Sequence, residues 1–373
     1  MRKPRGDHQA LEPTSQLVLR AVDARVAGDL LIINYPADGF LATLKARHSA
    51  IQPVGFTHDY RAHRHACAAY TTAGYARTEL HFGPLYSAPA RYPAVLLFLP
   101  KSQLLTKLML TMAANHLTPA GHLLLVGHNK AGIQSSRSLA EEVIGPTAKV
   151  DAARHSVLFQ STQQAEVAPL QLAAWETIYP LQVGATSLQI VTLPGVFSHG
   201  RLDAGTQMLL ETLTEPLHGH VLDLGCGAGV IGAMIKQRWP ACVVDMVDVD
   251  ALALAATRRT LAVNGLATHP GPYATGGVFP SDVFSDVAGA YDWIISNPPF
   301  HAGVQIDYQA VTTFLQQAAD YLKPGGRLRI VANRFLKYQP LIEAHIGGCQ
   351  VIAENRQYGV YEALLGRAGG TTR

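Results

Sequence analysis

Residues 221–229 read VLDLGCGAG, and residues 294–300 read IISNPPF. The first stretch is an apolar strand ending in three closely spaced glycines, a turn that lets the backbone approach a ligand with no Cβ in the way. The second is an apolar strand that stops at Asn-Pro-Pro-Phe. A turn of the first kind can hold a nucleoside cofactor, and one of the second kind can hold a planar amino group. Together they predict an α/β fold with a cofactor turn and an amine-binding turn.

The rest of the second half alternates between strand-like and helix-like segments. Strands are expected at 221–224, 242–247, 293–296 and 328–332, helices at 230–238, 251–263 and 311–322, and a closing hairpin at 349–353 and 360–365. Such β-α-β-α order favours an open, mostly parallel sheet with helices on both faces. The hairpin adds an antiparallel C-terminal edge to that sheet.

The first half carries an imperfect copy of the second. Residues 117–129 read LTPAGHLLLVGHN and residues 322–333 read LKPGGRLRIVAN, so that Leu, Pro, Gly, Leu and Val recur at an offset of 205. Buried strands are also expected at 30–33 and 94–99. The repeat predicts two duplicated α/β domains, 1–172 and 173–373, with a strand at 186–191 leading into the second. The alternative is a chance match of a common helix–Pro-Gly–strand joint.

The two copies differ at the strand ends. After its first strand the N-terminal copy has NYPADG at residues 34–39 instead of spaced glycines, and at 100–102 it has PKS instead of Asn-Pro-Pro. We therefore expect a degenerate N-terminal domain that neither binds the cofactor nor holds the amine. A scaffold or RNA-binding role remains for it.

The composition is that of a folded protein in a reducing compartment. Of 373 residues, 48% are hydrophobic and 15% are charged, which allows sizeable cores. The four cysteines form neither a C-x-x-C pair nor a metal-ligand spacing, so we expect reduced thiols and no metal site. The longest apolar run, 94–99, is far below the roughly 20 residues that span a bilayer. No signal peptide is evident, and we expect a cytoplasmic protein without membrane contact.

Charge is unevenly distributed along the chain. Residues 1–185 carry 17 Lys and Arg against 12 Asp and Glu (+5), whereas residues 186–373 carry 13 against 15 (−2). A basic half beside a mildly acidic half suits a nucleic-acid docking surface joined to a pocket for a cationic cofactor. An accidental surface distribution is the alternative.

The glycine turn supplies the first group of candidate site residues. Its pattern places Asp223 two residues before Gly225-Cys226-Gly227, with Gly229 opening the next helix. The free N–H groups of that helix point toward a ligand. The spacing differs from the G-x-G-x-x-G pattern that places a pyrophosphate in dinucleotide enzymes.

The strand after the glycine turn supplies an acid. Asp248 lies 19 residues past Gly229, close to the spacing of about 20 that is typical of a ribose-binding carboxylate. Asp250 is its rival for this role. Asp245 is expected to face solvent from the strand.

The Asn-Pro-Pro-Phe turn supplies the candidate catalytic residues. Pro298 forces Asn297 into an extended conformation, and Pro298 and Pro299 together fix φ and remove two backbone donors. The Asn297 side-chain oxygen and the Pro298 carbonyl remain as rigid acceptors for an aromatic amine, and Phe300 can stack on the base. The alternative is a proline-rich strand exit that packs an aromatic into the core. Whether the adjacent His301 takes part in proton transfer is left open.

These motifs resemble those of a known enzyme family. Residues 223–229 resemble motif I of class I S-adenosylmethionine-dependent methyltransferases. Residues 196–207 (VFSHGRLDAGTQ) and 297–305 (NPPFHAGVQ) are similar to segments of the bacterial ribosomal RNA guanine-N2 methyltransferases. The resemblance also covers 328–338 in the second half, and 126–133 and 151–154 in the first. It is strongest to the ribosomal RNA small subunit methyltransferase C family.

The resemblance adds residues and a reaction. It implies that Asp282 contacts the adenine amino group beside Val283, and that Phe197, Asp203 and Gly205 shape the cofactor or target-base pocket. It implies methyl transfer from S-adenosyl-L-methionine to N2 of a guanine, G1207 of 16S rRNA, leaving S-adenosyl-L-homocysteine. The implied partner is 16S rRNA in the 30S subunit, and the implied enzyme is a monomer whose Rossmann-like N-terminal copy helps to bind RNA.

Three other functions fit parts of the same pattern. A 23S rRNA guanine-N2 methyltransferase shares most of these motifs. Protein-glutamine and DNA-adenine N-methyltransferases use a similar turn, although their aromatic residue is usually Tyr and a duplicated N-terminal domain argues against them. A non-catalytic RNA-binding assembly factor is the alternative without enzyme activity, against which two intact motifs argue.

Overall fold

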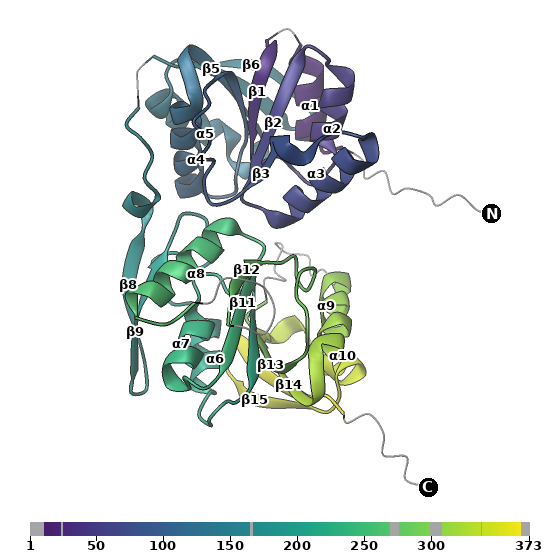
Figure 1. Ribbon diagram of the computed structural model, residues 1–373, viewed down its shortest axis with the longest axis vertical. Coiled ribbons are helices and arrows are strands. Elements are labelled where there is room, and N and C mark those ends of the chain that lie inside the picture. Colours follow the sequence, from purple (N-terminus) through teal and green to yellow (C-terminus); the bar gives the residue numbers. More distant parts are fainter. Residues whose placement is uncertain are drawn as a thin grey trace, which may run out of the picture. The chain divides into compact units, whose positions relative to one another are not determined.

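The structure is a computed structural model that describes residues 11–23, 25–164, 167–268, 276–298, 308–336 and 338–366. The chain divides into two compact units, Met1–Trp175 and Glu176–Arg373 (Figure 1). Within the described ranges, no helix combines the length and the apolar character that a membrane crossing requires.

The first unit is a seven-stranded sheet with helices on both faces. Its strand order is β3-β2-β1-β4-β5-β7-β6, and only the pairs that involve β6 and β7 are antiparallel. Figure 1 shows α4 and α5 on one side of this sheet and α1, α2 and α3 on the other. The elements are α1 (Pro13–Ala21), β1 (Gly28–Ile33), α2 (Phe40–Arg47), β2 (Ile51–Thr57), α3 (Tyr60–Ala73), η1 (Arg77–Glu79), β3 (Leu80–Phe82), β4 (Tyr92–Phe98), α4 (Gln103–His116), β5 (Leu117–His128), η2 (Asn129–Ala131), α5 (Ile133–Val143), β6 (Thr147–Ala153), β7 (Ser156–Thr162) and η3 (Leu172–Trp175).

The second unit repeats this architecture. Its main sheet has the order β12-β11-β10-β13-β14-β16-β15, in which β16 pairs antiparallel with both β14 and β15 and the other pairs are parallel. In Figure 1, α6, α7 and α8 lie on one side and α9 and α10 on the other. The elements are β8 (Thr177–Val183), β9 (Thr186–Thr192), α6 (Ala204–Glu211), β10 (His220–Leu224), α7 (Val230–Arg238), β11 (Val243–Asp248), α8 (Ala251–Val263), β12 (Val278–Pro280), β13 (Tyr291–Ser296), α9 (Tyr308–Tyr321), β14 (Leu322–Asn333), η4 (Arg334–Leu336), α10 (Tyr338–His345), β15 (Cys349–Glu354) and β16 (Tyr358–Leu364).

The duplication predicted from the repeat is visible in the strands. The two strand orders correspond position by position, and β5 and β14 have the same length at the offset of 205. The shared glycine serves one purpose in both copies. A Cβ on Gly121 would stand 2.8 Å from the Thr118 carbonyl oxygen, and one on Gly326 would stand 2.8 Å from that of Lys323. Both strands therefore bend at a place that only glycine can occupy.

Two strands differ from expectation. The strand expected at 328–332 is only the second part of β14, because the Pro-Gly-Gly joint lies inside the strand, beside a register shift opposite 291–293. The strand expected at 186–191 corresponds to β9, which pairs with β8 in a separate two-stranded sheet. This hairpin contacts α7 and α8, so it covers the helical layer of the second unit and does not extend its main sheet.

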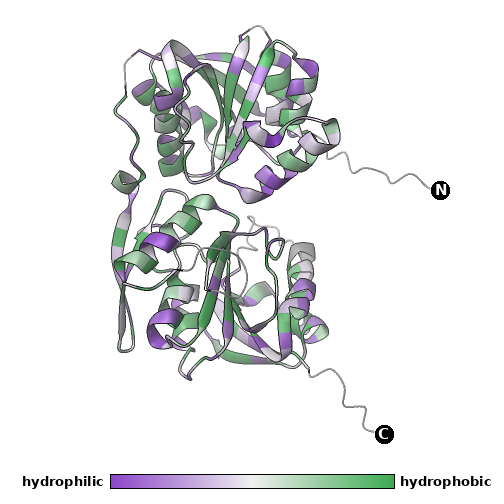
Figure 2. Ribbon diagram, in the orientation of Figure 1, coloured by the Kyte–Doolittle hydropathy of each residue, from purple (hydrophilic) through white to green (hydrophobic). Residues whose placement is uncertain are grey.

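Burial of the parallel strands drives both folds. In the second unit the core joins β10, β13 and β14 to α9, with Leu222, Ile294, Phe314 and Leu328 almost completely buried. Figure 2 shows hydrophobic residues along the central strands and hydrophilic residues mainly on helices and loops. Parallel strands with helices on both faces become nearly continuous apolar runs, which is why these strands could be recognised in the sequence.

The expectation that Asp245 faces solvent is wrong. Its side chain is fully buried, because β11 is paired on both edges and covered by helices. The carboxylate accepts hydrogen bonds from the backbone N–H groups of Gly276 and Gly277 (2.9 and 3.0 Å) and from the Tyr291 hydroxyl (2.8 Å). A buried carboxylate is tolerated when its oxygens are satisfied in this way.

Asp245→Ala should lower the free energy of unfolding of the second unit by about 3 kcal/mol or more, because it leaves three buried donors without an acceptor. Urea unfolding followed by the fluorescence of Trp239 and Trp293 measures this loss. Asp320→Ala, at an exposed position on α9, is the matched control and should cost less than about 0.5 kcal/mol. Equal effects of the two substitutions would contradict the structural role of Asp245.

Candidate functional site

The sequence motifs meet at one edge of the second sheet. The strands β10, β11, β12 and β13 are parallel and adjacent, so their carboxyl ends lie along the same edge. The chain crosses the sheet in opposite directions from β10, with β11 on one side and β13 on the other. Such a switch point is where open α/β sheets bind ligands.

In the glycine turn after β10, Gly229 is packed against a neighbouring helix and Gly227 has free space beside it. Gly225, Gly227 and Gly229 all have positive φ, at 72°, 56° and 76°. A Cβ on Gly229 would lie 2.9 Å from the Thr257 methyl carbon, so this glycine is required by the contact with α8. A Cβ on Gly227 would meet nothing within 4 Å. The backbone is therefore exposed to open space at Gly227, where a ligand can approach.

Asp248 is bound to that turn. One carboxylate oxygen accepts the Gly227 N–H (2.9 Å) and the other accepts the Asp250 N–H (2.9 Å). Removal from water raises the pKa of Asp248 to about 6 in spite of these bonds. Its rival Asp250 is the N-cap of α8 and accepts the Leu252 N–H (2.8 Å). The structure thus places Asp248 at the strand end and Asp250 at a helix start.

The side chains of Asp223 and Cys226 are buried. One Asp223 oxygen accepts the Gly232 N–H of α7 (2.8 Å), and the other has no hydrogen-bond partner. Burial, and secondarily the charge of Asp248, raises the pKa of Asp223 to about 7. The Cys226 thiol lies 3.4 Å from the Thr257 hydroxyl, and burial raises its pKa well above the ordinary value. Both side chains thus support the turn from within the protein.

Asn297 is held in one orientation at the end of β13. Its side-chain nitrogen donates to an Asp203 carboxylate oxygen (3.0 Å) and to the Thr206 hydroxyl oxygen (2.9 Å). Because a carboxylate can only accept, it fixes which side of the amide carries the nitrogen. Both amide hydrogens are used, and the amide oxygen is left as an oriented acceptor.

Asp203 links this amide to α6. The same Asp203 oxygen accepts the Thr206 N–H (2.8 Å), so the residue is also the N-cap of the helix. Gly205 makes this arrangement possible, since a Cβ there would stand 3.0 Å from the Asp203 oxygen and 3.2 Å from the Tyr358 ring. The resemblance had placed Asp203 and Gly205 in a ligand pocket, whereas their visible role is to position Asn297.

The remaining predicted residues follow other strands of the second unit or lie beside Asn297 in the sequence. Phe197 lies after β9, and 63% of its surface is exposed, which is a large fraction for an apolar side chain. Asp282 and Val283 follow β12, and Val283 has a φ of +55°, rare for a β-branched residue. The Ser281 hydroxyl holds this bend by donating to the Val283 carbonyl (2.8 Å). Pro298 is buried. Pro299, Phe300 and His301 lie outside the described residues.

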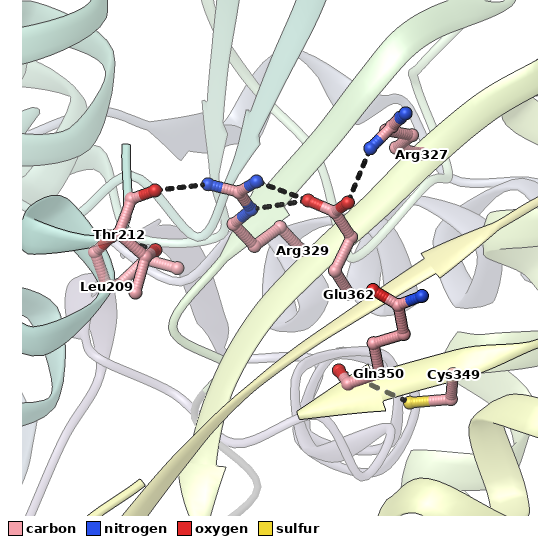
Figure 3. A network of polar contacts seen from close by, with 7 residues as sticks. All are labelled: Leu209, Thr212, Arg327, Arg329, Cys349, Gln350 and Glu362. Atoms are coloured by element: carbon pink, nitrogen blue, oxygen red, sulfur yellow. Dashed lines mark hydrogen bonds and ion pairs between the residues drawn. The ribbon is translucent and has the colours of Figure 1, made fainter. Parts of the chain in front are cut away.

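An ion-pair network that was not predicted from the sequence holds the carboxyl-terminal end of α6 (Figure 3). Arg329 of β14 donates to both an oxygen of Glu362 on β16 (Nε at 2.8 Å) and the Thr212 carbonyl at the end of α6 (2.9 Å). The other Glu362 oxygen accepts from Arg327 (2.6 Å). Arg329 and Glu362 are each only 9% exposed.

The two arginines also stack on an aromatic ring. Their guanidinium carbons lie 5.4 Å (Arg327) and 5.3 Å (Arg329) from the Trp293 ring centre. Their spacing of two residues, which puts both on one face of a strand, was the only sequence signal for this network. Its acidic partner comes from a different strand, so no local pattern could identify it.

The comparisons with known proteins agree with this geometry. The family profile described as "Methyltransferase small domain" matches residues 187–362, and "Methyltransferase small domain N-terminal" matches residues 15–179. The ribosomal RNA small subunit methyltransferase C of Pseudomonas entomophila (strain L48) is 41% identical over 358 residues, which cover 95% of this chain and 100% of that relative. The chain belongs to the ribosomal RNA small subunit methyltransferase C family.

Other members of the family match to a similar extent. The protein of the same name from Hahella chejuensis (strain KCTC 2396) is 39% identical over 95% of this chain and 99% of its own length. The solved structure of the T. thermophilus 16S rRNA N2 G1207 methyltransferase in complex with AdoMet and guanosine is 25% identical, with a TM-score of 0.80. The match covers 98% of this chain and 97% of that one. The predicted two-domain, Rossmann-like class I methyltransferase fold is confirmed.

The buried acid of the glycine turn predicts a pH dependence. Because the pKa of Asp223 is raised from 3.8 to about 7 in the folded chain, its protonated form favours folding. That contribution is fully present below pH 4 and is lost as the pH rises through 7. Asp223→Asn keeps the shape and does not titrate. Its free energy of unfolding relative to the native sequence should therefore rise between pH 4.5 and pH 7.5, by up to a few kcal/mol.

Urea unfolding at both pH values, followed by Trp239 and Trp293 fluorescence, measures this difference. Asp320→Asn at the exposed position on α9 is the matched control and should keep the native pH profile. If Asp223→Asn also kept that profile, the assigned titration of Asp223 would be wrong.

Proposed function

We propose that this chain transfers a methyl group from S-adenosyl-L-methionine to N2 of a guanine in 16S rRNA, at G1207 in the small ribosomal subunit. The observation that carries the proposal is the oriented amide of Asn297 at the end of β13, adjacent to the glycine turn of β10. The full-length similarity to the T. thermophilus 16S rRNA N2 G1207 methyltransferase, solved with AdoMet and guanosine, supports it.

The residues of the glycine turn fit an S-adenosyl-L-methionine cofactor. Gly227 faces open space, and Gly229, the N-cap of α7, brings no side chain to the helix start. Asp223 accepts only the Gly232 N–H of the first turn, so the other N–H groups at this helix start can bind a ligand. The Asp248 carboxylate accepts backbone N–H groups, and its two oxygens carry further lone pairs for a ribose hydroxyl. Asp282 and Val283, which follow β12, are proposed to border the adenine. When bound, the cofactor supplies an electrophilic methyl group on a positively charged sulfur.

Asn297 and Pro298 prepare the nucleophile. The exocyclic amine of guanine is conjugated with its ring and is a weak nucleophile. The Asn297 side-chain oxygen and the Pro298 carbonyl each accept one N2 hydrogen, which aims the nitrogen lone pair and stabilises the positive charge that develops on N2. The N2–carbon bond forms as the sulfur–carbon bond breaks. N2 then releases one proton, for which water is a sufficient acceptor, and S-adenosyl-L-homocysteine is the product.

The N-terminal domain, residues 1–172, is proposed as a degenerate copy that binds RNA and supports the catalytic domain, 173–373. Where the second unit has its glycine turn after β10, the first unit has residues 34–39 after β1. The Asn34 amide donates to the Phe98 carbonyl (2.9 Å), which ties the ends of β1 and β4 together, and Tyr35 and Asp38 are buried behind it. We further propose a cytoplasmic monomer.

A 23S rRNA guanine-N2 methyltransferase is the nearest competing function. Incubating the purified chain with separated 30S and 50S subunits and labelled S-adenosyl-L-methionine, and then mapping the methylated nucleotide by mass spectrometry, distinguishes the two. Label in 16S rRNA at G1207 N2 supports the proposal. Label only in 23S rRNA, or no label despite cofactor binding, refutes it.

Asn297→Ala should lower kcat by at least about a hundredfold, because it removes an acceptor that acts on the charge developing in the transition state. The affinity for S-adenosyl-L-methionine, measured by calorimetry, should change by less than about twofold. Gln350→Ala removes an exposed carboxamide from β15 in the same unit and should leave both quantities unchanged. An Asn297→Ala variant with native turnover would exclude the assigned role.

Asp203→Ser separates the positioning of Asn297 from the capping of α6. Serine is as good an N-cap as aspartate, but its side chain is too short to reach the Asn297 nitrogen as well. We expect kcat to fall by about tenfold or more, with cofactor affinity retained and with a change in unfolding free energy below about 1 kcal/mol. A loss of stability without a loss of turnover would assign Asp203 to the helix alone.

A further inference from the structure

A polar cavity lies in the N-terminal unit, away from the residues assigned above. It has a volume of about 260 Å³ and opens between the loop after β4 and the loop after β5. Lys101 and Ser102 line it from the first loop, Lys130 and Gly132 from the second, and Ser136 from α5. The two loops are separated by α4 and β5, so the sequence alone does not indicate that they form one cavity.

The side chains around this cavity leave it positively charged. No Asp or Glu lines it. Lys107 and Lys323 pair with carboxylates, but across the described part of the chain no ion pair involves Lys101 or Lys130. Two lysines that form no ion pair among the described residues therefore line one cavity.

The Ser136 and Thr106 hydroxyl groups in the cavity lining already have hydrogen-bond acceptors within the protein. The Ser136 hydroxyl donates to the Gly132 carbonyl (3.0 Å), and that of Thr106 donates to the Ser102 carbonyl (2.9 Å). Their hydrogens are thus used within the helices. Gly132 brings no side-chain cap to α5, so the N–H groups of its first turn add to the positive potential of the lysines. A ligand with several anionic oxygens can accept from the two lysines and from the first N–H groups of α5 together.

The cavity occupies the position in the first unit that corresponds to the catalytic edge of the second. In the matching strand orders, β4 and β5 stand where β13 and β14 stand. Lys101 is the third residue after β4, and Pro298 is the second residue after β13. The edge that offers neutral acceptors to an amine in one copy therefore offers cations in the other.

We propose that this cavity binds a phosphodiester group of the RNA substrate through Lys101 and Lys130. This inference rests on the proposed function, because it takes the substrate to be RNA. A phosphate contact fixes the position of an RNA without reading its sequence. The N-terminal copy would thereby hold the RNA backbone while the other copy acts on a base.

The test compares two double variants of the full-length chain. Lys101→Ala/Lys130→Ala removes both cavity charges, and Lys107→Ala/Lys149→Ala removes two charges from the same unit outside the cavity. Fluorescence anisotropy with a labelled 16S rRNA hairpin that contains G1207 gives the dissociation constant between 50 and 300 mM KCl. We expect the cavity variant to bind about tenfold more weakly at low salt and to lose about 1 from the slope of log K against log salt, with the control within twofold of the native chain.

Further measurements separate this inference from the proposed function. Affinity for S-adenosyl-L-methionine should be native in both double variants, and circular dichroism checks that the N-terminal unit is folded. Lys101→Gln/Lys130→Gln replaces the cavity variant if that one does not fold. Because the contact is independent of sequence, a scrambled RNA of equal length should show the same loss, even if G1207 proved not to be the methylated base. Equal affinities and salt slopes for the cavity and control variants, or equal losses in both, would overturn the site.

Discussion

The candidate site depends on the hydrogen bonds that hold the Asn297 side chain. Its nitrogen is bound by Asp203 and Thr206, so the amide cannot rotate and its oxygen remains available as an acceptor. These two partners come from the start of α6, ninety or more residues earlier in the chain. Arg329 and Glu362 bind the other end of the same helix to the sheet. The helix is therefore fixed at both ends, and the geometry of one amide depends on the packing of the whole unit.

The duplicated fold shows how one architecture can carry two different sets of strand ends. The strand orders are identical, and the bend at Gly121 recurs at Gly326 because a Cβ would meet backbone in both places. The strand ends differ between the copies. In one copy Gly227 is open, whereas in the other the Asn34 amide ties the ends of β1 and β4 together.

Regular elements with a continuous apolar pattern were predictable. The helices expected at 230–238 and 251–263 coincide with α7 and α8, and the predicted C-terminal hairpin is formed by β15 and β16. The prediction failed for Asp245, because a charged residue in a strand suggests solvent when its partners are not visible. Its three donors come from residues 31 to 46 positions further along the chain. The site residues were selected by motif, and their catalytic and binding roles stay predictions that the proposed variants test.

The sequence by itself determined the fold class, the duplication, the family resemblance and the position of both motifs, because each of these is written in local spacing and apolar periodicity. Only the tertiary structure decided which way Asn297 is turned, that Asp203 is its partner, that Arg329 and Glu362 fasten α6, and that Lys101 and Lys130 line one cavity. These facts depend on side chains that are distant in the chain and adjacent in space. Such contacts arise when the strands pair and the helices pack, and no local pattern of residues encodes them.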